Sequence, residues 1–332
     1  MAREDPVKAC DDGSRDLYGV ATWDVRSPLD GIAVSVHRAL RAIGRAAAWV
    51  VVVVALPLAL LGLSAVGALE APIVGGFVVL SVVPALLLAA YVWRSDVTTR
   101  EPFGLLVATF ALAVVFAQIA GAANGVGGAL RAVPVVGPIW FFYLVVGPVE
   151  ETVKWLAVRV YAFRSERFDA VIDGAVYGAV AGLGFATVEN ALYIASAVDA
   201  PAIGNFLAAG EGIGPRRALA GPGHVLYSAY AGYYLGLAKF NPERAGPIAV
   251  KGLLVAALLH ATYNTLTLVP AAASTAFGVP RLAAFLAFVL LYDGFVGYLL
   301  YRKLARYRTA YRAARSEPEG RSIRPERTEF DP

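Results

Sequence analysis

Long apolar runs recur along the chain, and they constrain its fold more than any other feature. The 332 residues are 58% hydrophobic and only 16% charged, whereas about a quarter of a typical soluble domain is charged. Because a helix needs about 20 apolar residues to cross ~30 Å of hydrocarbon, runs of this length predict transmembrane helices. The sequence therefore predicts an all-α, polytopic integral membrane protein.

We expect about eight membrane-spanning segments, separated by connectors rich in glycine, proline and asparagine. They cover residues 47–68, 72–93, 103–122, 136–162, 170–198, 218–238, 248–268 and 282–301. Pro138 and Pro148 interrupt the fourth segment, which leaves open a re-entrant piece followed by a helix. Some 46 polar or amphipathic residues precede the first run, so we expect a retained anchor rather than a cleaved signal peptide.

The distribution of lysine and arginine predicts which connectors face the cytoplasm, because positively charged loops resist translocation. With eight spans and an inner N-terminus, 22 of the 29 Lys and Arg residues fall in inner segments and four in outer ones. Both termini are therefore expected in the cytoplasm, and the cell (plasma) membrane is the expected location.

Three regions follow from this topology: a cytoplasmic tail over 1–46, a transmembrane domain over 47–301, and a basic, partly disordered tail over 302–332. Apolar and basic residues alternate at helical spacing near the end of the first tail, which predicts a helix on the inner membrane surface. His37 belongs to that helix. Cys10 is the only cysteine, so no disulfide can form within the chain.

Ionisable residues inside apolar spans are candidates for function, because each costs roughly 2.5–3.5 kcal/mol at a helix centre. The candidates are Glu150, Glu151, Lys154, Arg159, Asp173, Glu189, His224, Lys251 and His260, with the amides Asn190 and Asn264. The depth of each residue in the membrane can be estimated from its distance to the centre of its segment, at about 1.5 Å per residue. A layer from the midplane to about 9 Å outward contains Glu150, Glu151, Glu189, His224, His260 and Asn264. Asp173 falls about 16 Å inward, near the inner interface.

Spacing along individual helices supports a convergent site. Lys154 follows Glu150 by four residues and Glu151 by three, so it can pair with either carboxylate. His260 and Asn264 share a face in the same way. Glycines at spacing four, over 174–182 and 232–236, predict close packing of two helices.

A buried carboxylate near imidazoles can deprotonate water, alone or with a metal. Two histidines and a glutamate form a familiar zinc ligand set, although the H-E-x-x-H signature is absent. The one serine near a histidine, Ser228, follows His224 by four residues on one helix, so serine catalysis is weakly supported. The alternative to catalysis is a purely structural role. Glu150, Glu151 and Lys154 would then form a buried ion pair, and the other polar residues of the spans would serve helix packing.

Four stretches resemble, in order and spacing, the motifs of the PrsW family of intramembrane proteases, distant relatives of the CAAX prenyl endopeptidases. They are "EETVKWLAV", "DAVIDGAVYGAVAGLGFATVENALYI", "GPGHVLYSAYAGYYLGLA" and "LLHATYNTL". The resemblance is strong over 147–268 and only general in the flanking helices, and the family pattern does not explain the two tails.

The resemblance implies hydrolysis of a peptide bond in a membrane-anchored substrate, such as an anti-sigma-factor-like regulator cleaved on its outer side. Glu150 and Glu151 fall at the paired glutamates and Lys154 at the lysine. Glu189 falls in the F-x-x-x-E-N motif with Phe185 and Asn190, and His224 and His260 at the two histidine motifs.

The sequence thus predicts a membrane peptidase in which Glu150 or Glu151 is the general base and Lys154 keeps the glutamates charged. His224 and His260 would bind a metal or stabilise the oxyanion, with Asn190 and Asn264 as donors and Glu189 as a second acid or ligand. Zinc or another divalent metal would be held by the two histidines with Glu189 or Glu151; otherwise no cofactor is expected.

The expected partners are the protein substrate and the lipid bilayer, without nucleic acid. The rival prediction is a transporter or channel with an acidic proton or cation site at the midplane. The sequence shows no inverted repeat, which argues against this alternative. A third is a non-catalytic scaffold that uses the glycines for packing alone.

Overall fold

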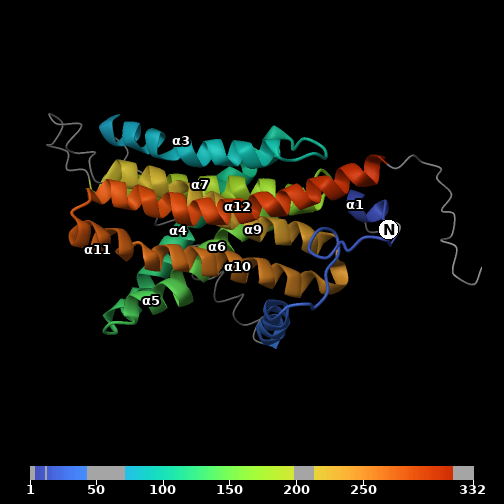
Figure 1. Cartoon of the computed structure of the whole chain (residues 1–332), viewed down its shortest axis with the longest axis horizontal. Coiled ribbons are helices and arrows are strands. Elements are labelled where there is room, and N and C mark those ends of the chain that lie inside the picture. The colour runs from blue at the N-terminus through green and yellow to red at the C-terminus, as the bar shows by residue number, and fades with distance from the viewer. Residues whose placement is uncertain (1–3, 12, 43–71, 198–212, 317–332) are drawn as a thin grey trace, which may run out of the picture.

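The computed structural model describes residues 4–11, 13–42, 72–197 and 213–316 of the chain, and those residues form a bundle of helices (Figure 1). No strand occurs in these ranges, where the single β-type contact is an isolated bridge between Tyr18 and Thr22. The predicted all-α class is therefore confirmed for the described part of the chain.

The helices follow one another along the chain with short connectors. They are α1 (Pro6–Ala9), a helix over 28–42, α3 (Pro72–Arg94), α4 (Phe103–Gly127), α5 (Gly137–Phe141), α6 (Gly147–Val160), α7 (Val171–Ala197), α9 (Ile213–Lys239), α10 (Ala245–Leu266), α11 (Leu268–Phe277) and α12 (Arg281–Ser316). Short 3-10 turns at Gly128–Ala132, Ala162–Arg164 and Pro242–Arg244 connect some of them.

Each predicted segment from residue 72 onward coincides with helical structure, whereas 47–68 lies outside the described residues. Five stretches are long and apolar enough to cross a membrane: Gly75–Arg94, Phe103–Ala132, Val171–Ser196, Pro242–Phe277 and Arg281–Arg315. The chain is therefore a multi-pass helical membrane protein. The sequence did not predict α11, a short helix that follows α10 almost directly.

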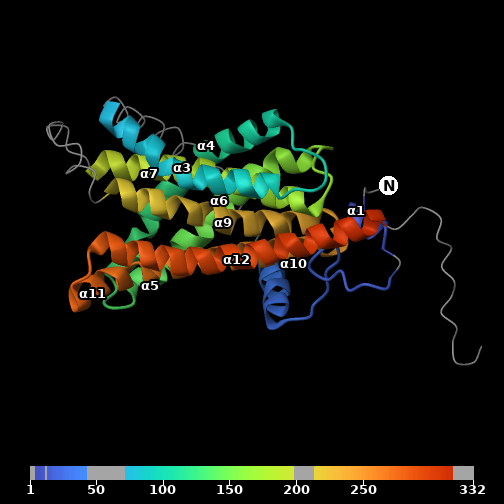
Figure 2. The same ribbon diagram turned by 45° about the horizontal axis from the view of Figure 1, so that its top comes forward.

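Helix α9 is not among those five because it is less apolar than they are, and it lies at the centre of the bundle. Every residue from Gly223 to Ala238 is buried, and the helix packs against α3, α7, α10 and α12 (Figures 1 and 2). A helix surrounded by protein does not need a uniformly apolar surface, because it meets other side chains rather than lipid.

The fourth predicted segment is one helical run from Gly137 to Val160 rather than two separate pieces. A π-helical turn, Phe142–Val146, joins α5 to α6. Pro148 is the second residue of α6 and lies just after the π-helical turn. Such π turns are frequent at functional sites, and this one ends four residues before Glu150.

Glycines let α7 and α9 meet backbone to backbone. A Cβ atom at Gly178 would overlap the carbonyl oxygen of Ser228, and one at Gly174 would overlap that of Gly232. A Cβ atom at Gly182 would overlap the carbonyl oxygen of His224. The predicted close packing is confirmed, and it brings α7 directly against the helix that carries His224.

The N-terminal segment packs into one end of the bundle, beside the end of α12 (Figure 1). The Asp5 carboxylate accepts hydrogen bonds from the backbone N–H of Val171 (2.8 Å) and the hydroxyl of Tyr307 (2.9 Å). Lys251 forms an ion pair of 2.5 Å with Asp30. In the 28–42 helix, His37 packs against Gly246 of α10; an interfacial position for that helix remains a prediction.

Candidate active site

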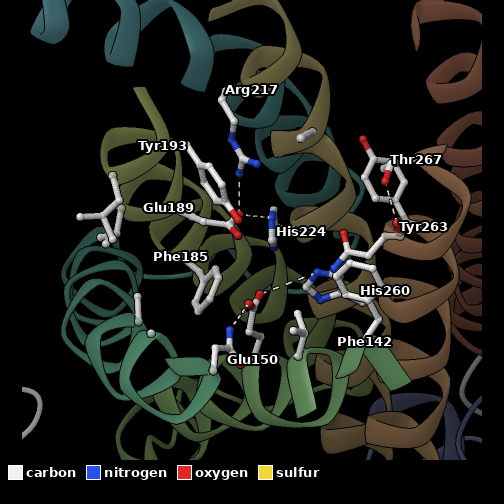
Figure 3. Close-up of a pocket in the computed structure, with 18 of the residues that line it drawn as sticks. Phe142, Glu150, Phe185, Glu189, Tyr193, Arg217, His224, His260, Tyr263 and Thr267 are labelled. Carbon is white, nitrogen blue, oxygen red and sulfur yellow. Dashed lines mark hydrogen bonds and ion pairs between the residues drawn. The ribbon is translucent and has the colours of Figure 1, made fainter. Parts of the chain in front are cut away.

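A cavity of about 660 Å³ opens among α4, α6, α7, α9 and α10. Four of the predicted site residues, Glu150, Glu189, His224 and His260, line it together with Asn264. Figure 3 shows Glu150 and His260 pointing toward each other, with Glu189 between Arg217 and His224. Side chains from helices far apart in the sequence therefore meet around one cavity, as the shared depth had predicted.

Glu150 is the member of the glutamate pair that faces this cavity. Its Oε1 accepts a hydrogen bond of 2.8 Å from the amide of Asn124 on α4. Its Oε2 is buried and has no hydrogen-bond partner in the described part of the chain. A buried carboxylate oxygen is costly to leave unsatisfied, so this atom is available for a proton, a water or a metal.

Glu151 lies behind the cavity and is not part of its lining. Its Oε1 accepts hydrogen bonds from Lys154 Nζ at 2.6 Å and from His260 Nδ1 at 2.9 Å. Its Oε2 accepts one of 3.2 Å from the Ser228 hydroxyl. Both oxygens of Glu151 are thus engaged in holding other side chains in place.

The two histidines are held by different partners. Lys154 donates to His224 Nδ1 at 2.9 Å, so His224 Nε2 carries the proton and donates to Glu189 Oε2 at 2.8 Å. His260 donates from Nδ1 to Glu151, which leaves the lone pair of Nε2 free, 3.7 Å from Glu150 Oε2. The imidazole rings stand edge to face, with centroids 5.0 Å apart.

Arg217 fixes Glu189 from the other side of the cavity, with its guanidinium 2.5 Å from Glu189 Oε2. The Asn190 amide holds that guanidinium, since Arg217 Nε donates to Asn190 Oδ1 at 2.8 Å. Asn190 also donates to the Ser81 hydroxyl at 3.0 Å. Asn190 is buried away from the cavity lining, so it contacts Arg217 rather than the space that a substrate would occupy.

The remaining sequence candidates lie away from the cavity. Asp173 sits at the start of α7 with Asp96 and Glu101. Lys251 pairs with Asp30, and the Arg159 guanidinium lies 4.4 Å from the Phe163 ring centroid.

Sequence reasoning missed Asn124, Arg217 and Asp293. The first two stand in stretches that were assigned to connectors, so nothing in their local pattern set them apart. Asp293 is an acid inside the last predicted span, and the rule that selected the other ionisable residues also selects it. It is buried and accepts a hydrogen bond of 2.9 Å from Tyr227, whose ring stacks on His260 at 5.5 Å.

Glu150, His224 and His260 can each offer one ligand atom, and these atoms lie within 4.8 Å of one another. All three side chains are buried. Two imidazoles with one carboxylate match the ligand sets of catalytic zinc sites. His260 also has the second contact typical of a ligating histidine, because its other nitrogen is bonded to a carboxylate.

Comparison with known proteins agrees with this geometry. The model of the "PrsW family intramembrane metalloprotease" matches residues 101–294. The chain is 32% identical over 193 residues to Protease PrsW of Bacillus subtilis, covering 55% of this chain and 78% of that protein. It is 30% identical over 193 residues to Protease PrsW of Geobacillus kaustophilus, covering 56% of this chain and 77% of the relative.

Protease PrsW of Shouchella clausii is 28% identical over 200 residues, covering 56% of this chain and 81% of that protein. No solved structure matches the chain. The family model spans more than half of the chain and includes every residue that lines the cavity. This chain therefore belongs to the PrsW family of intramembrane proteases.

Proposed function

We propose that this intramembrane peptidase hydrolyses a peptide bond of a membrane-anchored protein in the cavity that Glu150, Glu189, His224 and His260 line. The observation that carries the proposal is the buried Oε2 of Glu150, which lacks a hydrogen-bond partner in the described part of the chain and lies 3.7 Å from His260 Nε2. A carboxylate left open beside a free imidazole nitrogen suits a site that binds a reacting water.

The ligand set we propose is Glu150, His224 and His260, with zinc as the ion. The three residues fit such an ion because two donor atoms, Glu150 Oε2 and His260 Nε2, are free of hydrogen bonds among the described residues. For ligation through Nε2, His224 would release that proton and take one at Nδ1 from Lys154 Nζ, which would become a neutral amine. When bound, a zinc ion would make a water acidic and polarise the carbonyl of the scissile bond.

Glu189 is the cavity carboxylate that we assign as general base, in place of the two glutamates that the sequence suggested. Arg217 and His224 both contact Glu189 Oε2, which leaves Oε1 to accept the proton of the attacking water. Glu151 is unsuited to that task because both of its oxygens are engaged behind the cavity.

The other residues position these groups. Glu151 and Lys154 form a buried pair that orients His260 and His224 at the same time. Asn264 lines the cavity one turn after His260, where its amide can donate to the developing oxyanion. Asn190 acts through Arg217 rather than on the substrate.

We also propose that the chain crosses the plasma membrane eight times and has both termini in the cytoplasm. Residues 1–46 and 302–332 would then be cytoplasmic tails, and 47–301 would be the transmembrane domain. The N-terminal segment and the end of α12 lie at one end of the bundle, which supports an even number of crossings. The substrate we expect is a membrane-anchored regulator of the anti-sigma-factor kind, cut near the outer leaflet.

The test measures bound metal and turnover in purified variants in lipid nanodiscs. Glu150→Gln and His260→Ala should lose both the ion and cleavage of a reporter substrate. Glu189→Gln should keep the ion and lose about 10²–10⁴-fold in kcat, the usual contribution of a general base. If Glu150→Gln binds zinc as the parent does, or if Glu189→Gln cleaves at the parental rate, the assignment of roles is wrong.

A further inference from the structure

A second group of acidic side chains lies at the other end of α7, about 24 Å along the helix from Glu189. Asp96 and Glu101 come from the connector between α3 and α4, and Asp173 comes from the first turn of α7. One oxygen from each carboxylate lies within 4.8 Å of the others. This group has no part in the proposed reaction.

One oxygen of each carboxylate is fixed by hydrogen-bond donors. Asp173 Oδ2 accepts from the backbone N–H of Asp169 (2.7 Å) and of the next residue (2.8 Å). Asp96 Oδ1 accepts from the backbone N–H and hydroxyl of Thr98, at 2.8 and 2.7 Å. The Tyr177 hydroxyl donates to Glu101 Oε2. The orientation of all three carboxylates is therefore set before any ligand arrives.

The opposite oxygens are left without such donors. Asp96 Oδ2 and Glu101 Oε1 are buried and have no hydrogen-bond partner among the described residues, and Glu101 is only 4% exposed. The second oxygen of Asp173, Oδ1, has one contact, from the Thr98 hydroxyl at 3.4 Å. Orphaned carboxylate oxygens of this kind are rare in folded proteins and call for an explanation.

The charge of the group points in the same direction. Within the described ranges, no lysine or arginine forms an ion pair with Asp96, Glu101 or Asp173. The three carboxylates thus lack positive charge, which a cation would supply.

We infer that Asp96, Glu101 and Asp173 form a binding site for a hard divalent cation, Ca²⁺ or Mg²⁺. Carboxylate oxygens are the ligands these ions prefer, and the group contains no nitrogen or sulfur donor. Two oxygens bound to one Ca²⁺ at about 2.3–2.6 Å lie at most about 5 Å apart, and one oxygen from each of the three carboxylates lies within 4.8 Å of the others. The ion would tie the α3–α4 connector to the start of α7.

The test is binding of Tb³⁺, a luminescent stand-in for Ca²⁺, to the full chain in nanodiscs. Tyr177 contacts Glu101 directly and would sensitise the emission. We expect one saturable site, displaced by Ca²⁺ or Mg²⁺, whose affinity falls at least tenfold in Glu101→Gln. The order of displacement identifies which ion the site prefers.

Two matched variants separate this site from other acidic groups. Glu166→Gln removes an exposed carboxylate near the same end of α7, and His260→Ala disables the proposed catalytic ligand set. Both should keep the Tb³⁺ signal. Loss of the signal in His260→Ala, or equal affinity in the parent and Glu101→Gln, would overturn the inference.

Thermal unfolding provides a second measurement that does not depend on luminescence. An ion that binds only the folded state raises the unfolding temperature, so Ca²⁺ or Mg²⁺ should stabilise the parent but not Glu101→Gln. Glu101→Gln keeps the shape of the side chain, so we expect it to fold. If neither ion changes the unfolding temperature of the parent, the carboxylates share protons instead and the site does not exist.

Discussion

Glu150 and Glu151 are neighbours in the sequence, yet the protein gives them different surroundings. One turn of α6 directs Glu150 into the cavity and Glu151 toward Lys154, His260 and Ser228. The sequence predicted that the pair, the lysine and both histidines would meet. It could not separate the two glutamates, because their difference depends on side chains from α4, α9 and α10.

This difference predicts opposite effects on stability. Glu151→Gln leaves the buried Lys154 without its closest anion, and breaking such a pair costs about 3–5 kcal/mol. Glu150→Gln removes a carboxylate with an unsatisfied oxygen, so the free energy of unfolding should stay the same or rise. Thermal unfolding of the two purified variants checks this; equal destabilisation by both would contradict the distinction.

Asp293 and Tyr227 form a second contact that orients His260. The Tyr227 ring stacks on the imidazole, and its hydroxyl is held by Asp293 on α12. Tyr227→Phe keeps the stacked ring and loses the hydrogen bond, so we expect kcat to fall about tenfold with KM unchanged. Tyr227→Leu should lose more. Kinetics of Tyr227→Phe equal to those of the parent would show that the hydroxyl has no positioning role.

At the scale of helices, the sequence predicted the close pairing of α7 and α9 from the spacing of their glycines, and the Cβ overlaps at Gly174, Gly178 and Gly182 confirm it. It did not predict the π turn before α6 or the short helix α11. Those depend on how neighbouring helices pack, which the periodicity of a single segment does not contain.

The α7–α9 contact should be intolerant of a single methyl group. Gly178→Ala would place a Cβ against the Ser228 carbonyl, and overpacking of this kind costs about 1–3 kcal/mol. Because α7 carries Glu189 and α9 carries His224, activity should fall together with stability. The control is Gly294→Ala on α12, where a Cβ meets no atom within 4 Å; equal unfolding temperatures for the two variants would contradict this packing argument.

At the scale of the whole molecule, the apolar runs were enough to predict a multi-pass helical protein. They were not enough to show which helices face lipid, because α9 is surrounded by protein and carries part of the proposed active site. The N-terminal segment was predicted as a tail, yet Val7, Leu17 and Trp23 are buried against the bundle. Its apolar residues are scattered in short groups among polar ones, so they form no periodic pattern that predicts burial.

The proposed orientation can be tested with the only cysteine of the chain. Cys10 is exposed and lies in the segment that we place in the cytoplasm. A membrane-impermeant maleimide should label it only after cells are opened. The variant Arg216→Cys in a Cys10→Ser background should be labelled in intact cells. Labelling of Cys10 but not of the Arg216→Cys variant in intact cells would show that the orientation is the opposite one.

The most direct test of the account compares the N-termini of membrane proteins in cells that express the parent chain or Glu150→Gln at matched levels. We predict that specific fragments cut near the outer leaflet disappear in the variant while their intact precursors accumulate. Identical N-terminal profiles under several stress conditions would contradict the claim that the Glu150 cavity hydrolyses membrane-anchored substrates.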